Sequence, residues 1–198
     1  LDRDNHVQGH LLWWTVQQTD PDSPPISVRH LLTHTSGLPE NAPGVSYTTH
    51  TGPPRAELIK NLPDVATLYA AGSRPSYSNL GFAILGELVE AISGRPFTEY
   101  VERQILDPLG MSSTDLEPDP SMPDLATGYF SRIPGQVRRP VRFAKNFNTP
   151  AGDGAASLQD MVSFVSLLMT DSAESRGRVL SLATLREMRR PHWVNDDW

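Results

Sequence analysis

The residues best suited to chemistry lie in R-P-S-Y-S-N-L-G, residues 74–81, where one residue separates Tyr77 from Asn79. A tyrosine phenol has a pKa of about 10 and is a poor base at neutral pH, but nearby cations stabilise the phenolate. The Asn79 carboxamide donates and accepts hydrogen bonds, which suits it to orient a substrate amide or a neighbouring amine. The structural alternative is that Ser78 or Asn79 caps the helix that follows and that Tyr77 packs.

A serine nucleophile needs a base, and the sequence contains no arrangement that pairs the two. G-x-S-x-G, the strained elbow of one hydrolase class, does not occur. S-x-x-K places a serine and a lysine one helical turn apart, so that the amine can take the hydroxyl proton. The lysines are Lys60 and Lys145, and the residues three positions before them are Glu57 and Arg142. These 198 residues therefore contain no S-x-x-K.

Two histidines, His30 and His34, have the i, i+4 spacing that places both on one helix face. This spacing can hold zinc, and a metal-dependent hydrolase is a third hypothesis. A metalloprotease would carry Glu after the first histidine, where Leu31 stands, and no third ligand can be named. The alternative is packing and capping near a helix end, and we expect no metal and no cofactor.

The elements that position these residues are mostly helices. Ser27 is suited to cap a helix over 28–34, Gly37 to a left-handed turn after it, and Gly94 to the end of the apolar run 80–92. Pro134-Gly135 predicts the turn of a β-hairpin over 126–143. Three more helices are expected at 53–62, 97–106 and 181–188. A fourth is expected over M-V-S-F-V-S-L-L-M, residues 161–169, ahead of which S-x-x-D at 157–160 resembles a capping box. The sequence predicts a mainly α chain with a small β-hairpin.

Composition narrows the class of protein. The chain has 38% hydrophobic residues, a formal net charge of −6 and no cysteine. Disulfides, thiol nucleophiles and zinc-thiolate sites are excluded, and the acidic balance argues against nucleic acid as a partner. No run of 18 apolar residues occurs, so no membrane span is expected. We expect a single domain over 1–198.

Several segments, in this order, resemble the serine beta-lactamase-like hydrolases, which include class C beta-lactamases, DD-peptidases and related esterases. The two longest are I-S-V-R-H-L-L-T-H-T-S-G-L and Y-S-N-L-G-F-A-I-L-G-E-L-V-E-A-I-S-G-R-P-F, at 26–38 and 77–97. Shorter segments are similar too: L-D-R-D-N-H-V (1–7), I-L-D-P-L-G-M-S-S-T (105–114), A-T-G-Y (126–129) and P-A-G-D-G-A-A-S-L-Q-D-M (150–161). In this family, His34-Thr35-Ser36 corresponds to a structural turn.

The resemblance implies a two-lobed α+β fold, of the beta-lactamase and penicillin-binding-protein type, with a site between a sheet lobe and a helical lobe. The family uses S-x-x-K, then Y-x-N, then K-T-G or H-x-G. Only the middle motif is present, with Tyr77 as base or proton relay and Asn79 for positioning. Substrate-binding positions are implied at four residues: Ser78, Gly152, Asp153 and Gly154. Asp153 stands where the family has the second glycine of a G-G pair. The chain then corresponds to the helical lobe and linkers, an incomplete domain that lacks most of the central sheet.

The implied activity is attack on an ester or amide, in a beta-lactam, a peptide or a carboxylic ester, through an acyl-enzyme. The expected partners are a small-molecule or peptide substrate and the missing flanking segments of the same polypeptide. Without cations from the two missing motifs, the Tyr77 phenol is expected to stay protonated, and this chain alone to be inactive. The alternative is a catalytically inactive binding or scaffold member of the family. Family members often work outside the cytoplasm, but these 198 residues contain no signal-peptide pattern, so no compartment is predicted.

Overall fold

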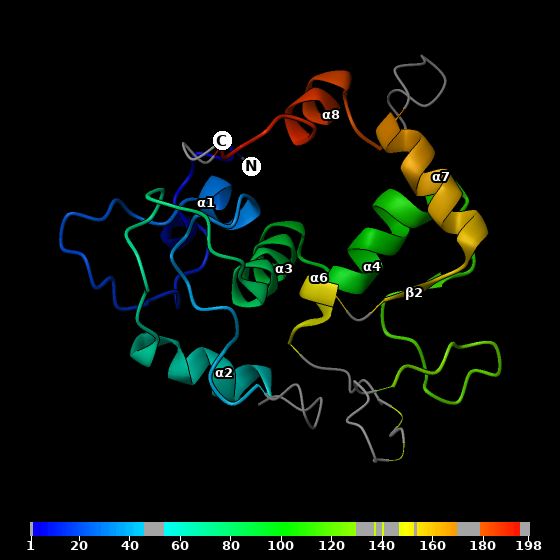
Figure 1. Cartoon of the computed structure of the whole chain (residues 1–198), viewed down its shortest axis with the longest axis horizontal. Coiled ribbons are helices and arrows are strands. Elements are labelled where there is room, and N and C mark those ends of the chain that lie inside the picture. The colour runs from blue at the N-terminus through cyan, green and yellow to red at the C-terminus, as the bar shows by residue number, and fades with distance from the viewer. Residues whose placement is uncertain are drawn as a thin grey trace.

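The computed structural model describes residues 2–45, 54–129, 137, 140, 147–152, 154–169 and 179–194. Helices dominate it, and α3 lies near its centre (Figure 1). The α-helices are α1 (Val28–Leu32), α2 (Arg55–Asn61), α3 (Asn79–Ser93), α4 (Phe97–Val101), α5 (Asp107–Leu109), α6 (Thr149–Gly152), α7 (Leu158–Met169) and α8 (Leu182–Met188). The remaining elements are 3-10 helices η1 (Val7–Gly9) and η2 (Leu62–Asp64), the π-helix η3 (Glu102–Leu106), and strands β1 (Thr114–Asp115) and β2 (Ala155–Ala156).

Local capping confirms most of the predicted helix ends. The Ser27 hydroxyl accepts a hydrogen bond from the His30 amide at 3.3 Å, and Nδ1 of His30 accepts one from the Ser27 amide at 3.2 Å. This is a reciprocal capping box in which histidine takes the usual place of Glu or Gln. Gly94 closes α3 in the left-handed conformation, with φ 68°, and the Ser181 side chain caps α8.

Pro108 does not end the predicted helix 97–106. The chain stays helical from Phe97 to Leu109, and Gly110 ends it with φ 68°. The π-helix η3 ends at Leu106, two residues before this proline. Proline has no amide hydrogen to donate back into the preceding turn, and the wider π register changes the hydrogen-bond pattern at that place. The structure therefore extends the helix by one turn beyond the prediction.

The strands form a two-stranded antiparallel sheet between distant segments. Thr114 pairs with Ala156 and Asp115 with Ala155. Most residues of the predicted hairpin over 126–143 lie outside the described part of the chain. Among those of its residues that are described, Tyr129 and Pro140 form an antiparallel bridge. The fold is mainly α, as predicted, and the small sheet that anchors the start of α7 was not foreseen.

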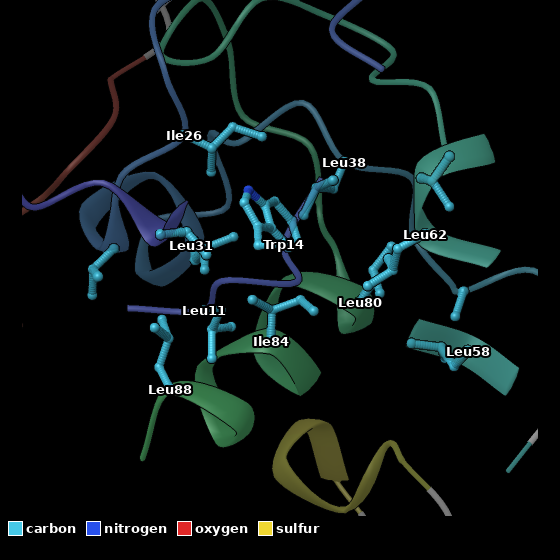
Figure 2. Packing of buried hydrophobic residues seen from close by; sticks show 14 of the residues in the cluster. Leu11, Trp14, Ile26, Leu31, Leu38, Leu58, Leu62, Leu80, Ile84 and Leu88 are labelled. Atoms are coloured by element: carbon cyan, nitrogen blue, oxygen red, sulfur yellow. The ribbon is translucent and has the colours of Figure 1, made fainter. Parts of the chain in front are cut away.

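The hydrophobic core gathers around Trp14, between the N-terminal segment, α1 and α3 (Figure 2). Leu80, Ile84 and Leu88 line one face of α3 at helical spacing and contribute to this cluster. Each fully buried leucine or isoleucine contributes about 1.5–3 kcal/mol relative to an exposed one. The core therefore fixes α3, whose first turn carries the Y-S-N residues.

Outside this core, specific polar contacts attach α2 and α7 to the rest of the fold. Glu87 of α3 is buried and forms a two-pronged ion pair with Arg55 of α2. Asp160 of α7 is also buried, and its carboxylate accepts hydrogen bonds from the Ser113 amide and the Thr114 hydroxyl, both at 2.8 Å. Within the described ranges, every helix is too short or too polar to cross a membrane.

Candidate active site

Ser78 is the N-cap of α3, as the structural alternative proposed. Its hydroxyl accepts a hydrogen bond from the Gly81 amide at 2.9 Å and donates one to the Pro39 carbonyl at 2.8 Å. The side chain is 1% exposed, so it faces the interior. The cap fixes Tyr77 just before the helix and Asn79 in its first turn.

Tyr77 does not pack in the core, because its side chain is 59% exposed. One side of the ring lies against the His34 imidazole, with ring centroids 4.7 Å apart and planes inclined by 35°. Within the described part of the chain, no hydrogen bond engages the phenolic oxygen. Most of Tyr77 is therefore exposed at the surface, while its ring is held from one side by His34.

Asn79 is held by the loop that follows Gly37. Its Nδ2 donates a hydrogen bond to Oδ1 of Asn41 at 3.0 Å. The backbone amides of Asn79 and Leu80 both donate to the Glu40 carbonyl, at 2.7 and 3.2 Å. The side-chain hydrogen bond to Asn41 orients the Asn79 carboxamide. Asn41 was not predicted from the sequence, because 38 residues separate the two asparagines and no local pattern links them.

His34 contacts the same segment from its other side. Its Nδ1 accepts a hydrogen bond from the Ser78 amide at 3.1 Å, and its carbonyl accepts one from the Ser76 amide at 2.7 Å. Its ring also stacks on Phe82 of α3, with centroids 4.9 Å apart. Burial lowers the pKa of His34 below its ordinary value, so the imidazole is neutral at neutral pH.

The two histidines considered as metal ligands both use Nδ1 to accept a backbone hydrogen bond, His30 from Ser27 and His34 from Ser78. These are the capping and packing roles of the alternative interpretation. The residues that the structure describes hold no group of three or more metal-binding side chains. The neighbouring Thr35 and Ser36 are buried in the turn.

The predicted substrate-binding glycines lie apart from Y-S-N. Gly152 ends α6, which packs on α3 where Pro150 meets Gly86; Gly154 lies beside Leu116, and Asp153 is outside the described residues. Gly86 follows Asn79 by seven residues, which places both on one face of α3, about 10 Å apart along the axis. The structure thus brings Tyr77, Ser78 and Asn79 together and places α6 two turns further along the same helix.

A cavity of about 490 Å³ opens elsewhere, between the N-terminal segment, α1 and the end of α8. None of the residues predicted for catalysis or substrate binding lines it, although His30 does. Arg29 in its wall is paired with Asp4 at 2.7 Å and with Glu187 at 3.1 Å, and Arg3 is paired with Glu187 at 3.0 Å. These arginines already have carboxylate partners, so we place the candidate site at Tyr77 and Asn79.

Solved structures define the class of fold. A D-stereospecific amidohydrolase from a Streptomyces species matches all of this chain and 60% of its own, with a TM-score of 0.75 and 24% identity. The octameric penicillin-binding protein homologue from Pyrococcus abyssi matches 96% of this chain and 43% of its own, with a TM-score of 0.75 and 23% identity. The chain has the helical part of a beta-lactamase and penicillin-binding-protein-like fold.

The chain belongs to the Beta-lactamase family, whose model matches residues 1–197. The D-alanyl-D-alanine-carboxypeptidase/endopeptidase AmpH of Escherichia coli K12 is 39% identical over 98 residues, which cover 48% of this chain and 26% of that protein. The D-aminopeptidase of Brucella anthropi is 32% identical over 126 residues, covering 61% of this chain and 24% of that protein. The matched region is thus about a quarter of the length of these relatives. The family and these relatives are hydrolases of the serine beta-lactamase kind.

Proposed function

We propose that this chain supplies the tyrosine and asparagine of a serine hydrolase that cleaves an ester or amide through an acyl-enzyme. The observation that carries the proposal is that Tyr77 is exposed and held beside Asn79 at the start of a core helix. The chain that presents these residues is a member of the Beta-lactamase family. Tyr77 takes the proton of the attacking serine and passes it to the leaving group. Asn79 orients the substrate or a neighbouring amine.

The nucleophile and the cations that activate the phenol come, in this proposal, from residues outside these 198. The His34 ring beside Tyr77 is neutral and supplies no charge. A phenolate is stabilised only by nearby positive charge or hydrogen bonds. The chain alone is therefore expected to be inactive.

The proposal gives the remaining site residues indirect or rim positions. The Ser78 hydroxyl is engaged inside the protein, so we assign its contribution to capping α3 rather than to a direct side-chain contact with substrate. Gly152 ends α6, which packs on the side of α3 that carries Asn79, and Gly154 lies beside Leu116. With Asp153, these two glycines form the proposed rim of the substrate site.

The test compares wild type with Tyr77→Phe in the longest product that the gene encodes. The measurements are hydrolysis of p-nitrophenyl acetate and nitrocefin, and labelling by a serine-reactive phosphonate. Loss of a proton-transfer group lowers kcat by about 10²–10⁴-fold. The free energy of unfolding should change by less than about 0.5 kcal/mol, since Tyr77 is exposed and its hydroxyl has no hydrogen bond within the described part of the chain.

Three results would contradict the proposal. One is a full-length product without S-x-x-K or hydrolase activity, which would support the binding or scaffold alternative. Another is an activity loss that unfolding of the variant fully explains. The third is phosphonate labelling of the 198-residue chain by itself, because the nucleophile would then lie within these residues.

A further inference from the structure

We propose that His34 is the positioning residue of the site, holding Tyr77 in place through the backbone on both sides of it. This inference rests on the proposed function, because His34 would serve catalysis only by positioning Tyr77, the proposed proton-transfer residue. His34 itself does not contact the reacting atoms. The sequence suggested a possible metal ligand at this position, and the family resemblance implied a structural turn.

Three contacts converge on residues 76–78. The His34 carbonyl accepts from the Ser76 amide at 2.7 Å, and its Nδ1 accepts from the Ser78 amide at 3.1 Å. Between these two anchored amides stands Tyr77, whose ring lies 4.7 Å from the imidazole. One residue therefore fixes the backbone before and after Tyr77 and also limits the position of its ring.

The imidazole is itself held in place. Its ring stacks on Phe82 at 4.9 Å, one turn into α3. The backbone of His34 is left-handed, with φ 55°, the one such non-glycine residue in the described chain. That conformation is uncommon outside glycine, although histidine and asparagine adopt it more readily than most residues.

The contact depends on one tautomer. Nδ1 can accept from the Ser78 amide only while it carries no proton, so the proton of the neutral ring is on Nε2. Burial favours the neutral ring, which supports this arrangement. Ser78 also caps α3, and Asn79 starts it, so the same contact connects both proposed catalytic side chains to His34.

The experiment compares His34→Asn with His34→Gly in the longest encoded product. Both residues adopt left-handed φ and keep the backbone carbonyl, but only asparagine keeps a side-chain acceptor near the position of Nδ1. We expect His34→Gly to lower kcat for p-nitrophenyl acetate at least tenfold with KM within threefold. His34→Asn should stay within about threefold of wild type. Leu88→Ala, a core change on α3, controls for lost stability and should leave kcat within threefold.

Two NMR readouts decide the inference independently of catalysis. The Ser78 amide should be protected from hydrogen exchange in wild type and His34→Asn, and should exchange faster in His34→Gly. The ¹⁵N spectrum of the wild-type imidazole should show the Nε2–H tautomer, a test that needs no variant to fold.

An Nδ1–H tautomer, equal Ser78 exchange in the Gly and Asn variants, or equal kcat in both would overturn the role of His34. A wild-type protein that has no hydrolase activity would overturn the proposed function instead. In that case the tautomer and the exchange rates still determine whether His34 holds residues 76–78.

Discussion

At the scale of single residues, the geometry around Gly37 supports the whole Y-S-N loop. Gly37 has φ 74°, and a Cβ placed on it would lie 2.1 Å from the Tyr69 carbonyl oxygen. Its own carbonyl accepts a hydrogen bond from the Leu68 amide at 2.7 Å. The turn after α1 and the loop before Tyr77 therefore approach each other at a point where a side chain does not fit.

Gly94 offers a matched comparison for Gly37→Ala. It has a similar φ of 68°, but a Cβ there meets no atom within 4 Å. Gly94→Ala should cost about 1–2 kcal/mol from the left-handed backbone alone. Gly37→Ala should cost about 1–3 kcal/mol more, because the backbone must move apart. Urea denaturation of both variants measures the difference, and equal costs would contradict the close approach.

At the scale of elements, α3 is the base of the site and Gly86 determines how close α6 comes to it. A Cβ on Gly86 would lie 2.2 Å from Cγ of Pro150, so the two helices pack through the absence of a side chain. A Cβ on Gly81, in the first turn of α3, would make only ordinary van der Waals contacts, the nearest at 3.5 Å from the Ser78 hydroxyl oxygen. The two glycines lie in one helix but differ in their surroundings.

Replacing each glycine by alanine separates helix propensity from packing. Gly81→Ala should be neutral or stabilise the protein by up to about 1 kcal/mol, because alanine favours the helix. Gly86→Ala gains the same propensity but should destabilise by about 1–3 kcal/mol through overpacking against Pro150. Thermal unfolding of the two variants gives the comparison. A Gly86→Ala variant as stable as Gly81→Ala would show that α6 does not pack on α3 as described.

At the scale of the whole molecule, ion pairs join the N-terminal segment to α8. Two carboxylates and two histidines should all make the folded protein less stable as pH falls. Hydrogen bonds from Arg29 lower the pKa of Asp4 and of Glu187 below their ordinary values, 3.8 and 4.5. Burial lowers the pKa of His30 and His34 below 6.5. Each group binds protons more weakly in the folded protein than in the unfolded chain, so stability falls as pH falls.

This reasoning predicts two pH windows of lost stability. The histidine contribution is full above pH 6.5 and is lost as pH falls through the lowered histidine pKa values. The carboxylate contribution is full above pH 4.5 and is lost below it. Urea midpoints from pH 8 to pH 3 measure both.

Two substitutions assign the upper window. His30→Gln keeps a capping-box residue at that position but does not titrate, and His34→Asn likewise removes a titrating ring. The double variant should lose the decline that begins near pH 6.5 and keep the one below pH 4.5. An unchanged decline in the upper window would rule out these two histidines as its cause.

Helix ends and family membership were determined by the sequence alone. A cap joins groups within about four residues, so Ser27, Ser181 and Gly94 could be interpreted without any knowledge of the rest of the chain. The ordered motifs around Tyr77 indicated the Beta-lactamase family, which the family model confirms. Residue roles at the site stay predictions, because they depend on activity.

The tertiary structure decided how the site is held. His34 and Ser78 are 44 residues apart, and Asn41 and Asn79 are 38 apart, so no local pattern predicts either contact. The same holds for the β1–β2 pairing and for the contact of Pro150 with Gly86. Such contacts depend on the packing of the α3 face into the core, which brings distant segments together, whereas capping depends only on the hydrogen bonds of neighbouring residues.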